Sequence, residues 1–265
     1  MDGLENRDNY IFIQGDVCNP QLVNHIFITE NIDVIFHLAA KTHCPSVFQR
    51  VNVDGTRVLL DAAHRAPHRP QRFVYVSTDE VYGTSLDEAF DEGCPLRPTN
   101  PYAATKAAAE YLVRSYWDKY QVWVLHFFFQ MSQVIPRFLT LLQNNNKCTI
   151  QGTLAISRHF LFVSDAVQAF LLVLEKGTVG DVYNVGTSVE IPIVQLAREL
   201  VRMVGLVKYV RHQPQVDLRY PIRSEKLQRL GWRAETSWAE GIRQTGSIIH
   251  PDQRIRKEPE KASNT

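Results

Sequence analysis

Short apolar runs alternate with stretches of helical periodicity through the first two-thirds of the chain. The runs have the length of buried strands, and none reaches the roughly 18 residues of a membrane span. Apolar strands separated by helices are typical of a parallel sheet covered on both faces, so we predict a doubly wound α/β fold. The predicted strands cover residues 10–14, 33–40, 72–77, 122–129 and 182–186, and the predicted helices cover residues 21–30, 53–64, 101–119, 161–174 and 193–204.

Two local signals add to this pattern, one at the start of a predicted helix and one near the C-terminal end of the chain. Asn100-Pro101 is a favourable helix start, because proline is well tolerated in a first helical turn. From residue 249 onward the chain is polar and charged, which predicts a disordered tail over 249–265.

Composition narrows the class of protein only a little. The 265 residues are 45% hydrophobic and 22% charged, with a formal charge of +1, so nothing electrostatic favours a nucleic-acid partner. The first seven residues lack the apolar core of a signal peptide, and we expect a cytoplasmic protein with no membrane partner. The four cysteines are far apart in sequence, which favours reduced thiols over a metal site.

Three polar clusters follow predicted strands, at residues 15–17, 38–42 and 77–80. Ligands of an open parallel sheet bind beyond the carboxyl ends of its strands. Any one cluster could be a simple turn, but three at the same edge of one sheet predict a binding site.

Tyr102 and Lys106 form a further candidate pair, since a spacing of four places both on one face of the predicted helix. A nearby ammonium lowers the pKa of a phenol toward neutrality, which would make Tyr102 usable as a base. Such pairs are usually surface neighbours, but this one follows the strand that ends in Ser-Thr-Asp-Glu.

Two segments carry a family resemblance: Tyr-Val-Ser-Thr-Asp-Glu-Val-Tyr-Gly at 75–83 and Asn-Pro-Tyr-Ala-Ala-Thr-Lys at 100–106. They resemble the extended short-chain dehydrogenase/reductase superfamily. The adjacent acid pair Asp79-Glu80 is similar to that of the dTDP-glucose 4,6-dehydratases in particular. The resemblance runs, with gaps, from about residue 9 to about residue 248.

The resemblance implies an NAD-dependent dehydration of a nucleotide-sugar. Tyr102, assisted by Lys106 and Thr78, would take the proton of the sugar 4-hydroxyl while hydride moves to NAD+. Glu80 would remove the C5 proton, and Asp79, kept protonated, would protonate the departing 6-hydroxyl. Hydride then returns to C6. Two adjacent carboxyls with opposite tasks need pKa values pushed apart by their surroundings.

The family pattern also implies binding residues and regions. The implied cofactor contacts are Asp16 and Val17 at the adenine, Leu38, Ala39, Ala40 and Lys41 beside the pyrophosphate and nicotinamide, and Tyr102 and Lys106. The implied substrate contacts are Thr42, Thr78, Arg158, Asn184 and Arg219. Residues 1–131 with 160–186 would form the NAD-binding region, and residues 132–159 with 187–248 the substrate region.

The chain departs from that pattern at several places. The family's first strand, its Gly-x-x-Gly-x-x-Gly turn, a helix and a second strand have no counterpart, so we expect a sheet missing its first two strands. That loss would expose an edge of the strand at 33–40 and weaken NAD+ binding. The family's Thr-Arg-x-x-Asn-x-Tyr-Gly-Pro is His-Phe-Phe-Phe-Gln-Met at 126–131, and Gln213 and Val216 replace an Arg and a His.

Three hypotheses follow. The chain could be a dTDP-glucose 4,6-dehydratase by chemistry, with impaired activity. It could instead be a non-catalytic fragment that acts as a dimer partner, since family dimers use helices like those at 53–64 and 101–119. A nucleotide-sugar epimerase or decarboxylase is the third. If folded, the chain is expected to form a homodimer.

Overall fold

The computed structural model describes residues 7–85, 88–120, 124–129, 134–144, 146–151, 157–204, 211–213 and 220–249. The chain divides into two compact units. The first comprises residues 1–81, 96–128 and 177–183, and the second comprises residues 82–95, 129–176 and 184–265.

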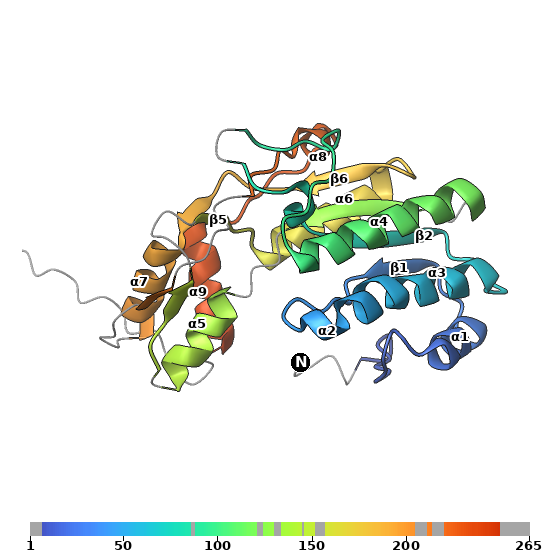
Figure 1. The fold of residues 1–265 in the computed structure, drawn as a ribbon, viewed down its shortest axis with the longest axis horizontal. Helices are drawn as coiled ribbons and strands as arrows, with labels where there is room; N and C mark the ends of the chain where they lie inside the picture. The colour runs from blue at the N-terminus through green and yellow to red at the C-terminus, as the bar shows by residue number, and fades with distance from the viewer. Residues whose placement is uncertain are drawn as a thin grey trace, which may run out of the picture. The chain divides into compact units, whose positions relative to one another are not determined.

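A four-stranded sheet has the strand order β1-β2-β3-β6 (Figure 1). Its strands are β1 (Val34–His37), β2 (Arg72–Ser77), β3 (Val124–Phe129) and β6 (Val182–Val185). β2 runs parallel to both β1 and β3, with Ile35 opposite Phe73 and Phe73 opposite Val124. The predicted α/β class is therefore confirmed, and β2 coincides with the predicted strand.

The prediction of a strand at residues 10–14 is wrong. No residue of this segment is in a strand, and Ile11, Phe12 and Ile13 are 74%, 64% and 45% exposed. A strand needs a neighbour for its backbone N–H and C=O groups, and no described segment pairs with this one. β1 is accordingly the edge strand of the sheet in the part of the chain that the structure describes.

Three helices of the first unit pack in sequence, α1 (Pro20–Thr29) on α3 (Gly55–Arg65) and α3 on α4 (Pro101–Tyr120). The Asn19 side chain caps α1 by accepting from the N–H groups of Gln21 and Leu22, both at 3.1 Å. α4 begins where the sequence predicted, after Asn100.

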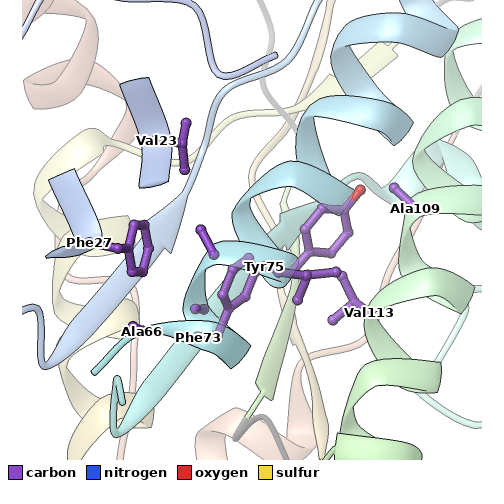
Figure 2. Close-up of a cluster of buried hydrophobic side chains, with 10 residues drawn as sticks. Val23, Phe27, Ala66, Phe73, Tyr75, Ala109 and Val113 are labelled. Carbon is purple, nitrogen blue, oxygen red and sulfur yellow. The ribbon is translucent and has the colours of Figure 1, made fainter. Parts of the chain in front are cut away.

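The core of the first unit lies between β2 and these helices (Figure 2). Phe73 and Tyr75 point from β2 toward Val23 and Phe27 of α1 and Val113 of α4 in this cluster. Val74 and Val76, which alternate with them, are also buried, so β2 is covered on both faces as a central parallel strand requires.

The segment before α3 is more helical than predicted. α2 (Pro45–Phe48) leads into the π-helical turn η1 (Gln49–Asp54), which continues into α3. π-helical turns are rare and occur often at functional sites. A short 3₁₀ turn, η2 (Asp79–Tyr82), follows β2.

The second unit is built on smaller sheets and its own core. Its elements are α5 (Val134–Gln143), β4 (Thr149–Gln151), β5 (Ser157–His159), α6 (Val163–Lys176), β7 (Glu190–Pro192), α7 (Ile193–Val204), β8 (Arg211–Gln213), α8 (Glu225–Arg229) and α9 (Trp238–Ile249). β4 pairs with β8 in parallel, and β5 with β7 antiparallel. Phe138, Leu142, Leu196, Leu200 and Ile242 lie in one buried cluster.

Two further sequence expectations concern membrane spans and the cysteines. None of the described helices combines the length and the apolar character of a membrane span. All four cysteines are described, and none is in a disulfide. The predicted tail lies outside the described residues, apart from Ile249 at the end of α9.

Candidate active site

The acid pair follows directly from the end of β2. Thr78 and Asp79 are 3% and 1% exposed, and the Thr78 hydroxyl donates to Asp79 Oδ1 at 3.1 Å. The Glu80 N–H donates to the same hydroxyl at 3.4 Å. The Thr78 hydroxyl is thus hydrogen-bonded to both acidic residues that follow it, at the start of the 3₁₀ turn η2.

Asn100 connects this turn with the start of α4. Its Oδ1 accepts from the N–H of Ala103 at 2.8 Å, which caps the helix. Its Nδ2 donates to Glu80 Oε2 at 2.7 Å. The same side chain therefore starts the helix that carries Tyr102 and orients the Glu80 carboxylate. The sequence identified Asn100 only as a helix start.

Tyr102 lies half-buried in the first turn of α4, edge-on to Phe48 with ring centroids 6.0 Å apart. Burial raises the pKa of Tyr102 well above its ordinary value, and the negative charges of Glu80 and Asp79 raise it further. The lowering of the Tyr102 pKa expected from the lysine is thus not found for the chain's own groups, because burial and then the two carboxyls raise it. Asn100, which binds Glu80 and caps the helix of Tyr102, brings the acid pair and the phenol into one site.

Lys106 is 3% exposed and does not present its ammonium to solvent. Its Nζ donates to the carbonyl of Val76 at 2.6 Å and lies 4.3 Å from the centroid of the Tyr75 ring. Burial lowers the pKa of Lys106 to about 7, while Glu110 opposes that shift. A surface role for the Tyr102–Lys106 pair is therefore excluded.

Asn52, a fully buried residue of η1, links the end of β1 with α4. Its Oδ1 accepts from the Lys41 N–H at 2.8 Å, and its Nδ2 donates to the Lys41 carbonyl at 3.1 Å and to Thr105 Oγ1 at 2.9 Å. The backbone beside Lys41 is thereby held against the helix turn of Tyr102 and Lys106. Asn52 is absent from the residues predicted for the site, and its only signal in the sequence is a polar residue between two valines.

The residues expected at the adenine form a separate loop before α1. Asp16 pairs with Arg50 of η1 at 2.9 Å and accepts from the Cys18 N–H, also at 2.9 Å. The Cys18 N–H and then Arg50 lower the pKa of Asp16. Val17 lies against Gly55, where a Cβ would come within 2.9 Å of its Cγ1. Glycine at the start of α3 therefore permits this close approach.

Of the three residues expected at the sugar nucleotide in the second unit, the structure describes Arg158 and Asn184. The Arg158 guanidinium lies over the Tyr220 ring at 5.1 Å. Asn184 is fully buried, and both ends of its amide are used within the protein, by the Tyr82 hydroxyl at 3.0 Å and the Phe90 carbonyl at 3.2 Å. Arg219 lies outside the described residues.

Comparison with known proteins decides the family. A family model described as GDP-mannose 4,6 dehydratase matches residues 2–245. The chain is 46% identical to the dTDP-D-glucose 4,6-dehydratase of Homo sapiens, over 92% of this chain and 76% of that protein. It is 45% identical to the enzyme of the same name from Bos taurus, over 99% of this chain and 80% of that protein. This chain belongs to the dTDP-D-glucose 4,6-dehydratase family.

A solved structure of a dTDP-glucose 4,6-dehydratase agrees with this assignment. DesIV from Streptomyces venezuelae, with NAD and TYD bound, superposes with a TM-score of 0.84 at 30% identity. The superposition covers 97% of this chain and 84% of DesIV.

The residues present fit a dinucleotide at its nicotinamide end. Leu38, Ala39 and Lys41 are exposed and Ala40 is half-exposed after β1, and Asn52 fixes that segment next to the Tyr102 turn. At the other end, the 265 residues contain no Gly-x-x-Gly-x-x-Gly turn to surround a pyrophosphate. The fit to the dehydratase cofactor is thus partial.

Proposed function

We propose that this chain carries the catalytic groups of a dTDP-glucose 4,6-dehydratase, which converts dTDP-glucose to dTDP-4-keto-6-deoxyglucose with NAD+. One observation carries the proposal: Asn100 both hydrogen-bonds Glu80 of the acid pair and caps the helix that begins beside Tyr102, at the buried end of a parallel strand. Proton removal at a hydroxyl and at an adjacent carbon requires a base and two further acid–base groups in one place.

Tyr102 is the proposed base for the sugar 4-hydroxyl. Lys106 places a positive charge one helical turn away, which favours the phenolate that the proton transfer needs. Thr78 lies beside Asp79 with a hydroxyl that could reach the sugar. NAD+, when bound, supplies the acceptor of the hydride and later its donor.

Asp79 and Glu80 are the proposed pair for the elimination. Glu80 removes the proton next to the new ketone, and Asp79 protonates the departing hydroxyl. Their surroundings differ in the way that such a division needs, since Asp79 is 1% exposed whereas Glu80 is only half-buried and hydrogen-bonded to the Asn100 amide. Asn100 would orient the Glu80 carboxylate toward the substrate.

The remaining binding residues are proposals that rest on family membership. The proposed cofactor contacts are Asp16, Val17, Leu38, Ala39, Ala40 and Lys41, and the proposed substrate contacts are Thr42, Arg158, Asn184 and Arg219. Asn184 would act through Tyr82 and Phe90, because its own amide is occupied by them. The assignment of residues 1–131 with 160–186 to NAD, and of 132–159 with 187–248 to the sugar nucleotide, also stays a proposal, as does the cytoplasmic location.

The reaction is tested by supplying the purified chain with excess NAD+ and either dTDP-glucose or UDP-glucuronate. We expect the absorbance of a 4-keto-6-deoxy sugar in alkali from dTDP-glucose alone. Loss of carbon dioxide from UDP-glucuronate would favour the decarboxylase hypothesis, and a 4-epimer of either substrate would favour the epimerase. No reaction with any of them would contradict the proposed activity.

We expect the 265-residue chain to retain NAD+ poorly, because it lacks the glycine-rich turn whose N–H groups bind a pyrophosphate. NAD+ added to the purified chain should be lost on desalting, and DesIV treated in parallel serves as the control. Measurement of the cofactor released by heating each sample gives the stoichiometry. One NAD+ per chain after desalting would show that other groups replace the missing turn.

The hypothesis of a non-catalytic dimer partner has one observation in its favour. Ile11, Phe12 and Ile13 are exposed, and β1 has an open edge among the described residues. Apolar segments and open edges of this kind associate readily with other chains. A homodimer formed through α3 and α4 stays a prediction.

A further inference from the structure

Four residues spaced by four line one face of α4: Tyr102, Lys106, Glu110 and Arg114. Glu110 is fully buried and Lys106 is 3% exposed, whereas the Arg114 side chain is 43% exposed. Arg114 Nη2 donates to Glu110 Oε1 at 2.7 Å. The face thus leads from a cation at the surface through a buried acid and a buried cation to the proposed base.

The second carboxylate oxygen of Glu110, Oε2, is not bound by an arginine in this way. Oε2 is buried without a hydrogen bond in the described structure, and so is the Ser77 hydroxyl. The Ser77 hydroxyl is the polar neighbour on that side, and its hydrogen-bonding effect lowers the pKa of Glu110. A carboxylate is costly to keep charged when it is fully buried, and burial accordingly raises the pKa of Glu110 to about 7.

The charged and titratable side chains around Glu110 point to a function for this carboxylate. Arg114 approaches from the surface side of α4, Tyr75 from β2 lies between the helix and the sheet, and His37 from β1 adjoins Lys106. Tyr75 donates to the Lys106 carbonyl at 3.2 Å, and neither it nor the neutral His37 supplies negative charge. Among the described groups within this buried cluster, the ionised form of Glu110 supplies the negative charge that opposes deprotonation of Lys106.

We propose that Glu110 is a positioning residue whose buried carboxylate keeps Lys106 protonated, and so maintains a positive charge beside Tyr102. The proposal rests on the proposed dehydratase function for its effect on turnover. It makes a separate statement about the proton on Lys106, which holds whether or not the chain is active. With a Lys106 pKa of about 7, the charge is sensitive to any loss of that anion near neutral pH.

The direct test is the titration of Lys106 in chains labelled with ¹³C at lysine Cε, with the Lys106 signal assigned from its absence in Lys106→Arg. In Glu110→Gln the Lys106 midpoint should fall by about one pH unit, since an opposite charge nearby shifts a pKa by that much or more. Glu110→Asp keeps the charge and should recover most of the shift.

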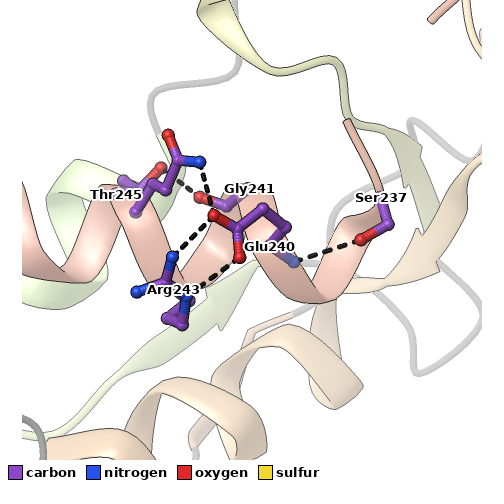
Figure 3. A network of polar contacts seen from close by, with 6 residues as sticks. Ser237, Glu240, Gly241, Arg243 and Thr245 are labelled. Carbon is purple, nitrogen blue, oxygen red and sulfur yellow. Dashed lines mark hydrogen bonds and ion pairs between the residues drawn. The ribbon is translucent and has the colours of Figure 1, made fainter. Parts of the chain in front are cut away.

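Arg114→Gln provides an independent variant that leaves Glu110 in place. Without Arg114, Glu110 becomes protonated more readily, so the Lys106 midpoint should again fall. Glu240→Gln is the matched control, because Glu240 also pairs with an arginine on its own helix, but at the surface of α9 (Figure 3). It should leave the Lys106 midpoint unchanged.

The turnover of dTDP-glucose adds a second measurement. A fall of one unit from about 7 reduces the protonated fraction of Lys106 at pH 7 about fivefold, and kcat should fall by that factor while KM changes little. The deficit should shrink toward pH 6, whereas a merely structural defect would lower kcat equally at both values.

These outcomes distinguish the proposed dehydratase function from the proposed role of Glu110. An inactive wild-type chain would contradict the proposed function, and the Lys106 titration would still decide the role of Glu110. An unchanged Lys106 midpoint in both Glu110→Gln and Arg114→Gln would overturn the role of Glu110, even in an active enzyme.

Discussion

Tyr102→Phe should lower the turnover of dTDP-glucose by about 10²- to 10⁴-fold, the contribution typical of a general acid–base group. The substitution removes the hydroxyl and keeps the ring, so the edge contact with Phe48 remains. No hydrogen bond of the described residues engages the Tyr102 hydroxyl, and the free energy of unfolding should therefore change little. Initial rates at saturating NAD+ and dTDP-glucose, with urea denaturation of the same sample, measure both quantities.

Tyr116→Phe is the matched control for this substitution. Tyr116 lies on the same helix, and its hydroxyl donates to Asp61 Oδ1 at 2.7 Å, away from the acid pair. It should keep wild-type turnover and lose about 1 kcal/mol of stability, as expected for one hydrogen bond. Equal turnover in Tyr102→Phe and the wild type would remove Tyr102 from the proposed mechanism.

The sequence predicted the elements whose signals are local. The strand at 72–77 coincides with β2, and the helix at 193–204 with α7, because each has an unbroken pattern with clear ends. The strand at 10–14 failed for the opposite reason. Its pattern is as apolar as that of β2, but a strand exists only with a neighbour, and a single segment does not report whether one is present.

The candidate site shows the same difference between features with a local signal and features that depend on distant residues. The motif residues lie on neighbouring elements, because hydrogen bonds of Glu80 with Asn100 and of Lys106 with Val76 join the end of β2 to the start of α4. The contacts that hold them could not be predicted, since Asn52 and Asn100 act on residues far from them in sequence. The direction of the Tyr102 pKa shift could not be predicted, because it depends first on the burial of the phenol and then on how close the two carboxyls come to it.

His37 connects the site with the stability of the fold. It is 3% exposed, and its Nε2 lies 2.8 Å from Thr56 Oγ1. The Thr56 hydroxyl donates its proton to the Asn52 carbonyl at 2.7 Å, so it accepts from the Nε2–H of His37. A neutral His37 therefore completes the chain of hydrogen bonds that fixes Asn52, Lys41 and Thr105.

Acidification should destabilise the folded chain, because His37 takes up a proton more readily after unfolding. Burial, and secondarily the charge of Lys106, lower the pKa of His37 from 6.5 to about 3. Because the unfolded chain binds a proton more readily than the folded one, the neutral His37 contributes stability that is fully present above pH 6.5. That contribution is lost as the pH falls toward 3, and at pH 4.5 the loss amounts to about 3 kcal/mol.

Glu110 acts in the opposite direction over the same range. Burial raises its pKa to about 7, so the folded chain gains a proton more readily and becomes more stable as the pH falls from 7 toward 4.5. The unfolding free energy of the wild type alone would mix these two effects. The His37 contribution is therefore obtained from a comparison of variants at two pH values.

His37→Gln, which cannot be charged and can still donate to Thr56, should be less stable than the wild type at pH 7 because the ring contacts with Phe73 and Tyr75 are lost. At pH 4.5 this difference should shrink or reverse, by about 3 kcal/mol in total. Urea denaturation followed by circular dichroism gives the four free energies. His25→Gln, at an exposed position of α1, should show no such dependence. An equal His37→Gln deficit at both pH values would mean that His37 accepts its proton inside the folded chain.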